Sequence, residues 1–140
     1  MKRVCLVLLL VLAVAVTAEA RTCTPKDAEA ADAAVDHLDT WADVYDDFRR
    51  YGHCDDGSIA EGNSEGVARL LVDSWQTLPQ LADLVKRHPS FRDYVLRHID
   101  TTLDTGDLDR IADLATTACP ESSKALCASL KAAATKAAGQ

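Results

Sequence analysis

The chain has little of what β-sheets and membrane spans require. Strict alternation of apolar and polar residues persists nowhere over the length of a strand, and β-branched residues are scattered. No fixed-period repeat occurs, and no apolar run reaches the ~20 residues with which a helix crosses a bilayer. Aromatic residues make up only 5% of the chain and lie mostly at apolar helix positions, which indicates core packing. These absences exclude a sheet protein and a repeat protein, and they favour the all-α class.

Basic residues are also scarce. The whole chain has 15 Lys and Arg against 22 Asp and Glu, a formal net charge of −7. Nucleic-acid binding is therefore excluded as an expected function, because affinity for phosphates comes from Lys and Arg side chains that release counterions. Anionic membrane surfaces are disfavoured on the same grounds.

The first twenty residues have the three parts of a secretory signal peptide. A basic start, Met1 to Arg3, precedes an apolar run over 4–16 and an A-x-A site at 18–20. The apolar run is too short for a membrane anchor. We therefore expect a cleavable signal over 1–20 and one exported helical domain over 21–140, periplasmic or secreted and without a membrane span in the mature form. Without Lys2, Arg3 and Glu19, 13 basic and 21 acidic residues remain, a formal charge of −8.

Three-and-four spacing of apolar residues predicts a compact bundle of about five to six short-to-medium helices. The first is predicted to run from about residue 25, after Thr24, to 51. The later helices are predicted to start at Ser58 or Asn63, at Pro79, at Pro89, at Thr105 and at Pro120. The tail after about residue 132 is rich in Ala and Lys, and we expect it to fray.

Four cysteines remain after the signal, which predicts a bundle stapled by two disulfides: Cys23, Cys54, Cys119 and Cys127. A straight helix between the first two would hold them about 46 Å apart, far beyond the reach of a disulfide. Either that helix is kinked or shorter, or only one bridge crosses to it. We expect the pairs Cys54–Cys119 and Cys23–Cys127.

One string matches a catalytic motif. Residues 62–66, Gly-Asn-Ser-Glu-Gly, fit the G-x-S-x-G turn of serine hydrolases, with Ser64 as nucleophile. His88 or His98 is a candidate base, and Asp73, Asp83 or Asp93 would complete a triad in the right chain order. An acidic pair on one helix face, Glu61 and Glu65, is a second catalytic candidate. The motif, however, requires a strand before the serine, and here the preceding residues predict a helix start. The alternative is that Asn63 and Ser64 cap a helix. We therefore expect a binding protein rather than an enzyme.

Metal chemistry has no support in the sequence. No two of the four histidines have metal-ligand spacing on a helix, and bridged cysteines offer no thiolate cluster. The acidic loop that begins at Asp100 carries Ile111 where a calcium loop needs its last carboxylate. We expect no metal and no other cofactor.

The clearest surface signal is acidic. Ten acidic residues lie between Asp27 and Asp56, against only Lys26, Arg49 and Arg50 in and beside this segment. Such a face steers a basic partner towards the protein. We expect another, basic protein to dock on Asp39, Asp43, Asp46, Asp47 and Tyr51. Two alternatives stay open: a small periplasmic hydrolase and an exported domain that binds a small ligand.

In size, export signal, helical content and cysteine use, the chain resembles the small periplasmic immunity proteins, which protect bacteria from toxins delivered into that compartment. The resemblance is architectural. It implies an inhibitor or immunity-type protein that neutralises a secreted basic protein, and it assigns no residue.

Overall fold

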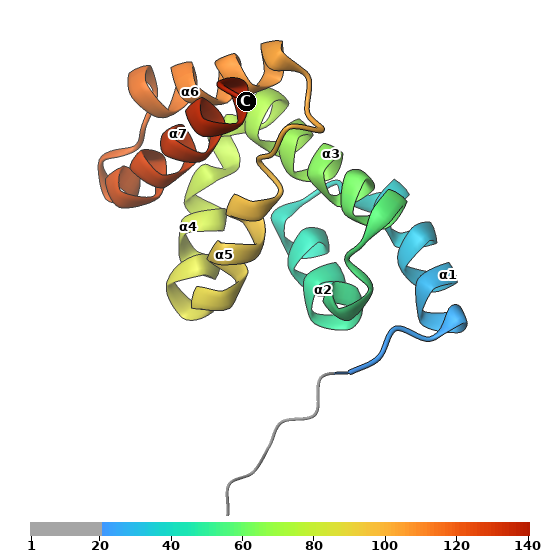
Figure 1. The fold of residues 1–140 in the computed structure, drawn as a ribbon. Helices are drawn as coiled ribbons and strands as arrows, with labels where there is room; N and C mark the ends of the chain where they lie inside the picture. The colour runs from blue at the N-terminus through green and yellow to red at the C-terminus, as the bar shows by residue number, and fades with distance from the viewer. Residues whose placement is uncertain (1–20) are drawn as a thin grey trace, which may run out of the picture.

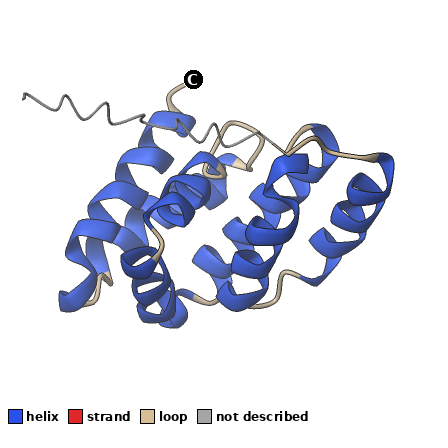
Figure 2. Cartoon of the chain, turned by 90° about the horizontal axis from the view of Figure 1, so that it is seen from below, coloured by secondary structure: helices blue, strands red, loops and turns tan. Residues whose placement is uncertain are grey.

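A computed structural model describes residues 21–140, and this part of the chain consists of helices and loops without a strand (Figure 2). The predicted all-α class is confirmed. None of the helices in this range combines the length and the apolar character needed to cross a membrane. The predicted signal peptide, residues 1–20, lies outside the described residues.

Seven α-helices and four short 3-10 helices follow one another along the described chain: α1 (Pro25–Ala34), η1 (Val35–His37), α2 (Trp41–Tyr51), η2 (Gly52–Cys54), α3 (Gly57–Asp73), η3 (Trp75–Thr77), α4 (Leu78–Arg87), α5 (Pro89–Arg97), α6 (Thr105–Thr117), η4 (Glu121–Ser123) and α7 (Lys124–Ala138). Helix α3 runs through the molecule and contacts α1 and α2 on one side and α6 on the other (Figure 1). Helices α4 and α5 pack together, and α6 and α7 form the most extensive helix pair.

The single helix predicted over 25–51 is wrong, because the chain breaks after η1. Leu38 has φ −88° and ψ 59°, which is not helical, and Thr40 starts a new helix. The Thr40 hydroxyl accepts the amide N–H of Asp43 at 3.2 Å, as Thr24 accepts that of Asp27 at 3.1 Å at the start of α1. Two capped helices therefore replace one long helix.

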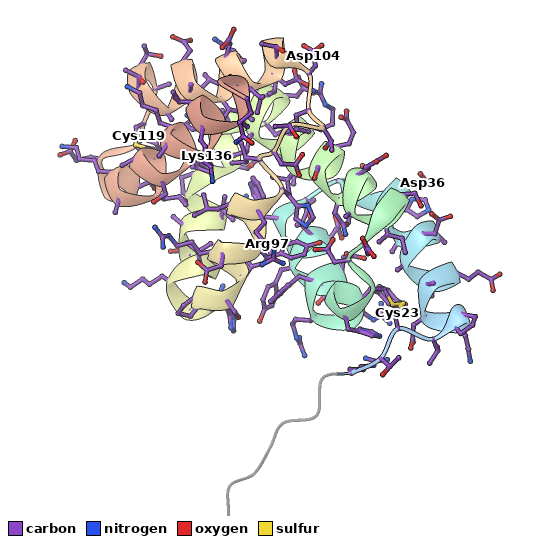
Figure 3. The ribbon with its side chains drawn as sticks, in the orientation of Figure 1. Cys23, Asp36, Arg97, Asp104, Cys119 and Lys136 are labelled. Atoms are coloured by element: carbon purple, nitrogen blue, oxygen red, sulfur yellow. A yellow bond between two sulfur atoms is a disulfide. The ribbon has the colours of Figure 1, made fainter. Side chains whose placement is uncertain are left out.

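The break corrects the predicted disulfide pairing. The bonds join Cys23 to Cys54 and Cys119 to Cys127, with Cα atoms 5.0 Å and 6.1 Å apart. Because α1 and α2 fold back on each other, the two ends of the 25–51 segment meet. Cys23 and Cys119 lie at opposite ends of the molecule (Figure 3), so the bridges expected between the halves, Cys54–Cys119 and Cys23–Cys127, do not form.

Most buried side chains belong to one core between α2, α3, α4, α5, α6 and α7. Its largest fully buried members are Trp41, Tyr94, Phe91, Leu71, Leu78, Leu81, Ile111 and Leu130. A smaller cluster of Ala31, Cys54 and Ile59 packs around the first disulfide. Three of the seven aromatic residues, Trp41, Phe91 and Tyr94, are therefore fully buried in the core, in agreement with the packing role predicted for them.

The C-terminal tail is part of the fold, which corrects the prediction that it frays. Helix α7 continues to Ala138, and both Ala134 and Ala137 are buried. The methyl side chain of alanine lets α7 approach its neighbours closely. The low apolar content of the tail was therefore misleading.

Two glycines on α3 allow η1 to pack against it. A Cβ atom on Gly62 would lie 2.9 Å from the Cβ of Val35, and one on Gly66 would lie 2.7 Å from a methyl carbon of Leu38. Real Cβ atoms do not approach other carbons this closely, so the contact requires glycine at both positions. One turn of helix separates the two glycines, which places them on the same face.

We predict that Gly62→Ala destabilises the protein by about 1–3 kcal/mol through overpacking, although alanine favours the helix by about 1 kcal/mol elsewhere. Chemical denaturation measures the difference. In a Val35→Ala background, which makes room for the new methyl group, the same substitution should cost much less. Equal costs in the two backgrounds would show that this contact does not explain the glycine.

We predict that the two disulfides differ in their contribution to stability. The bonds close segments with sequence separations of 31 and 8 residues. The chain-entropy relation gives about 3.7 kcal/mol for the longer loop and about 2.5 kcal/mol for the shorter. Denaturation of a Cys23→Ala/Cys54→Ala variant and a Cys119→Ala/Cys127→Ala variant compares them. Peptide mapping of the unreduced protein checks the pairing, and a bridge between the halves contradicts it.

Candidate functional site

A polar network lies buried where α3, the end of α5 and the loops beside them meet. The Ser64 hydroxyl is 2.9 Å from Nδ1 of His98 and 3.0 Å from a carboxylate oxygen of Asp100. On the other side of the imidazole ring, Nε2 lies 3.2 Å from the carboxylate of Asp55. The Asn63 amide donates to Asp55 at 3.1 Å. We call these five residues the Ser64–His98 network.

Local structure fixes each member of the network. Asn63 and Ser64 are consecutive residues inside α3, and both are buried. His98 ends α5, and its amide N–H bonds to carbonyl groups of the last turn. Asp100 accepts the amide and the hydroxyl of Thr102 at 2.8 Å and 2.6 Å, which holds its carboxylate in place. The network thus ties α3 to the end of α5.

The network brings together two of the residues predicted for a hydrolase, Ser64 and His98, and adds Asp55 and Asp100, which the sequence reasoning missed. The set contains a serine, a histidine and carboxylates, as a catalytic triad does. Ser64 and His98 are thus in contact, as a catalytic pair has to be. Whether Ser64 can act as a nucleophile depends on the direction of the hydrogen bonds.

The geometry fits a structural role for Ser64. Its single proton goes to Asp100, because a carboxylate accepts only, and Nδ1 of His98 must then donate to the hydroxyl. A general base has to accept the serine proton instead. The hydroxyl is also only 1% exposed, within a continuous helix rather than at a strand-to-helix turn. The interpretation of Asn63 and Ser64 as helix caps is wrong as well, since Asp56 caps α3.

The carboxylates of the network have altered acidity. Burial alone raises the pKa values of Asp55 and Asp100, but favourable contacts outweigh it. For Asp55 the adjacent His98 side chain lowers the pKa most, and for Asp100 the bonds from Thr102 do so. Arg97, 3.6 Å from Asp55, adds a second positive charge. Both carboxylates are therefore held in the ionised form.

Asp47 behaves in the opposite way. It lies on α2, is only 4% exposed, and neither of its carboxylate oxygens has a hydrogen-bond partner among residues 21–140. Burial and the nearby charge of Asp55 raise its pKa to about 6, and His98 and the Tyr94 hydroxyl counteract only part of this rise. Burial and both carboxylates also raise the pKa of Tyr94 above its usual range. Asp47 was predicted to bind a partner on the surface, and its burial corrects that prediction.

The acidic face contains a groove of about 430 Å³ between η1 and α3. Four carboxylates line it: Asp36, Asp39, Glu65 and Asp73. Arg69 is the basic residue of the lining, and it forms ion pairs with Glu65 at 2.9 Å, with Asp73 at 3.2 Å and with Asp107. The groove therefore has a strong negative charge, and its one cation is already engaged.

The other predicted partner residues lie around a neighbouring hollow. Asp43, Asp46 and Tyr51 line a cavity of about 250 Å³ beside η1, together with His37 and Arg50. Leu38 contributes to the walls of both cavities. Asp39 and Asp46 are exposed, whereas Tyr51 is half-buried and packs against the first disulfide cluster.

The remaining candidates do not form a site. Glu61 is exposed, and Glu65 is engaged with Arg69, so the two do not share a pocket as an acid pair. His53 lies 3.4 Å from Asp27, and the ring of His88 stacks on Tyr45. In the part of the chain that the structure describes, no group of three His, Cys, Asp or Glu side chains is arranged to hold a metal ion.

Comparisons with known proteins identify no relative: no protein-family model, no curated protein and no solved structure matches the chain.

We predict that Asp47 makes the protein less stable as the pH rises from about 4 to 6. Its carboxyl group titrates near 3.8 when unfolded and near 6 in the fold, so in this range the folded state binds more protons. Asp47→Asn should remove this decline and stabilise the protein at pH 7 by about 1 kcal/mol or more. Chemical denaturation of both proteins from pH 4 to 8 measures the free energy of unfolding as a function of pH. The exposed neighbour provides a control, because Asp46→Asn should leave the profile unchanged; identical effects of the two variants contradict the prediction.

Proposed function

We propose that this protein is an exported binding protein whose acidic surface on α1, η1, α2 and α3 docks a basic partner protein. The observation that carries the proposal is the groove between η1 and α3, lined by four carboxylates and one engaged arginine. Charge is distributed unevenly along the chain: residues 21–85 contain 14 acidic and 5 basic residues, and residues 86–140 contain 7 and 8. The acidic half therefore supplies most of the electrostatic attraction for a basic partner.

The groove is suited to cationic side chains from a partner. Two exposed carboxylates of the groove that take part in no ion pair among residues 21–140, Asp36 and Asp39, can accept charge-assisted hydrogen bonds from lysine or arginine. The apolar floor includes Val35, Leu38 and Leu70, against which the methylene groups of such side chains can pack.

The walls of the groove are held rigid before any partner arrives. Segment η1 packs on the two glycines of α3, and the Cys23–Cys54 bond fastens α1 to the end of α2. A preformed surface loses little conformational entropy on binding, which favours affinity. This rigidity supports a recognition role for the groove.

Export supports the same proposal. Two disulfides form in the described chain, and disulfides persist in oxidising compartments outside the cytosol. The predicted signal peptide has the same implication. A small, disulfide-bonded helical protein with a rigid acidic surface suits an inhibitor or immunity-type role, in which it neutralises a basic exported protein such as a hydrolase.

We predict that reversing charge on this surface slows association with the partner. The variant Asp36→Lys/Asp39→Lys/Asp46→Lys changes three exposed residues that form no ion pair and cap no helix within residues 21–140. Asp43 is left unchanged because it takes part in the cap of α2. A pull-down with tagged protein from the exported fraction of its host isolates the partner, and stopped-flow kinetics with purified proteins follow. We expect an association rate at least tenfold lower at low salt and a smaller effect at high salt.

A matched variant controls for overall charge. Asp83→Lys/Asp93→Lys/Asp109→Lys reverses three exposed acids outside α1, α2 and α3 and gives the same net charge. It should slow association far less. If both variants slow association equally, the proposed surface is not the docking site, and if neither does, the steering role is wrong.

A further inference from the structure

Another cavity, away from the acidic surface, combines an apolar floor with a polar end. It has a volume of about 290 Å³ and lies between α4, the start of α5, η4 and the start of α7. Its apolar lining includes Ala82, Val85 and Leu126, and the exposed cations Lys86 and Arg92 stand at its edge. None of these residues belongs to the acidic surface described above.

Ser123, one of the residues that line this cavity, has a buried hydroxyl without a partner. The side chain lines the cavity and its residue is 3% exposed, and its hydroxyl oxygen has no hydrogen-bond partner among residues 21–140. It stands at the N-cap position of α7, yet it makes no capping bond. Buried hydroxyl groups are almost always hydrogen-bonded, so the Ser123 hydroxyl can form its bond with a polar group that enters beside it.

The charges around Ser123 favour an anion. The hydroxyl stands at the start of a 15-residue helix, where the helix dipole is positive. Arg92 donates a hydrogen bond to the Ser129 hydroxyl at 2.6 Å, which holds its guanidinium group beside the second turn of α7. Within residues 21–140, neither Lys86 nor Arg92 takes part in an ion pair, so both charges are available to a ligand.

We propose that this cavity binds an alkyl carboxylate of medium chain length. The carboxylate accepts hydrogen bonds from the Ser123 hydroxyl and from Arg92, and the alkyl chain lies against Val85 and Leu126. At roughly 30 Å³ for each water-sized group, 290 Å³ holds about ten heavy atoms. Octanoate has this size, so we take it as the probe. A ligand of about ten atoms in an open groove binds with a dissociation constant on the order of 1 mM.

The test is a titration of the disulfide-bonded, 15N-labelled protein with sodium octanoate, followed by NMR. We expect saturable shifts that are largest at the amides of Val85, Ser122, Ser123 and Ala125. Butyrate, which leaves the apolar floor uncovered, and octylammonium, which has the opposite charge, should each bind at least fivefold more weakly. These results would show that binding requires both the anionic head group and the alkyl chain.

Three variants separate binding from stability. Ser123→Ala should weaken octanoate binding about threefold or more without destabilising the fold, because it removes a buried hydroxyl that has no partner. Lys86→Gln/Arg92→Gln should weaken it at least fivefold. The matched control Lys131→Gln/Lys136→Gln removes two exposed cations of α7 that do not line this cavity, and it should leave binding unchanged.

Several outcomes overturn the proposal. The first is that binding does not saturate up to 20 mM octanoate, which is on the order of twenty times the expected dissociation constant. The others are chemical shift changes centred elsewhere on the protein and equal binding of octanoate and octylammonium. A peptide with a free C-terminal leucine that binds more tightly than octanoate also overturns it, since the site then belongs to a partner chain. None of these results bears on the acidic surface, which carries the separate function proposed above.

Discussion

The fold depends on the point at which the chain leaves the helix at Leu38 and restarts at Thr40. Because of this break, α1 and α2 lie beside each other and Cys23 reaches Cys54. The same break places η1 against α3, where only glycine at positions 62 and 66 leaves enough room. The groove between η1 and α3 exists for this reason, so the disulfide, the two glycines and the acidic surface follow from one local event.

The sequence predicted the helical class, most helix starts and the oxidised state of the cysteines, because caps, prolines and apolar spacing are local signals. It did not predict the break, since the apolar residues on both sides of Leu38 continue the same spacing. A signal was nevertheless present: Thr40 and Asp43 repeat the Thr24 and Asp27 pattern that starts α1. The prediction of the disulfide pairing was wrong because the break was missed. The prediction that the C-terminal tail frays was wrong because close packing of alanines depends on tertiary contacts.

The motif Gly62 to Gly66 illustrates how one short string can have two explanations. In the structure its members face two different neighbours: the glycines face η1, while Asn63 and Ser64 face the buried network. Sequence reasoning identified Ser64 and His98 as a possible pair, and they are in contact. It could not find Asp55 or the direction of the hydrogen bonds, because both depend on how the end of α5 meets α3. The buried Asp47 was missed for a related reason: an acidic residue among many acidic residues carries no local sign of burial.

Both disulfides join cysteines that are neighbours in the sequence, the first with the second and the third with the fourth in the described chain. A chain that emerges from a membrane pore with its N-terminus first presents Cys23 and Cys54 before either of the later cysteines. Oxidation in the order of emergence therefore produces the native pairs, and each thiol finds its partner without waiting for the rest of the domain. Given the export proposed above, such a protein requires little disulfide reshuffling, so its covalent connectivity is complete as soon as the last cysteine has crossed.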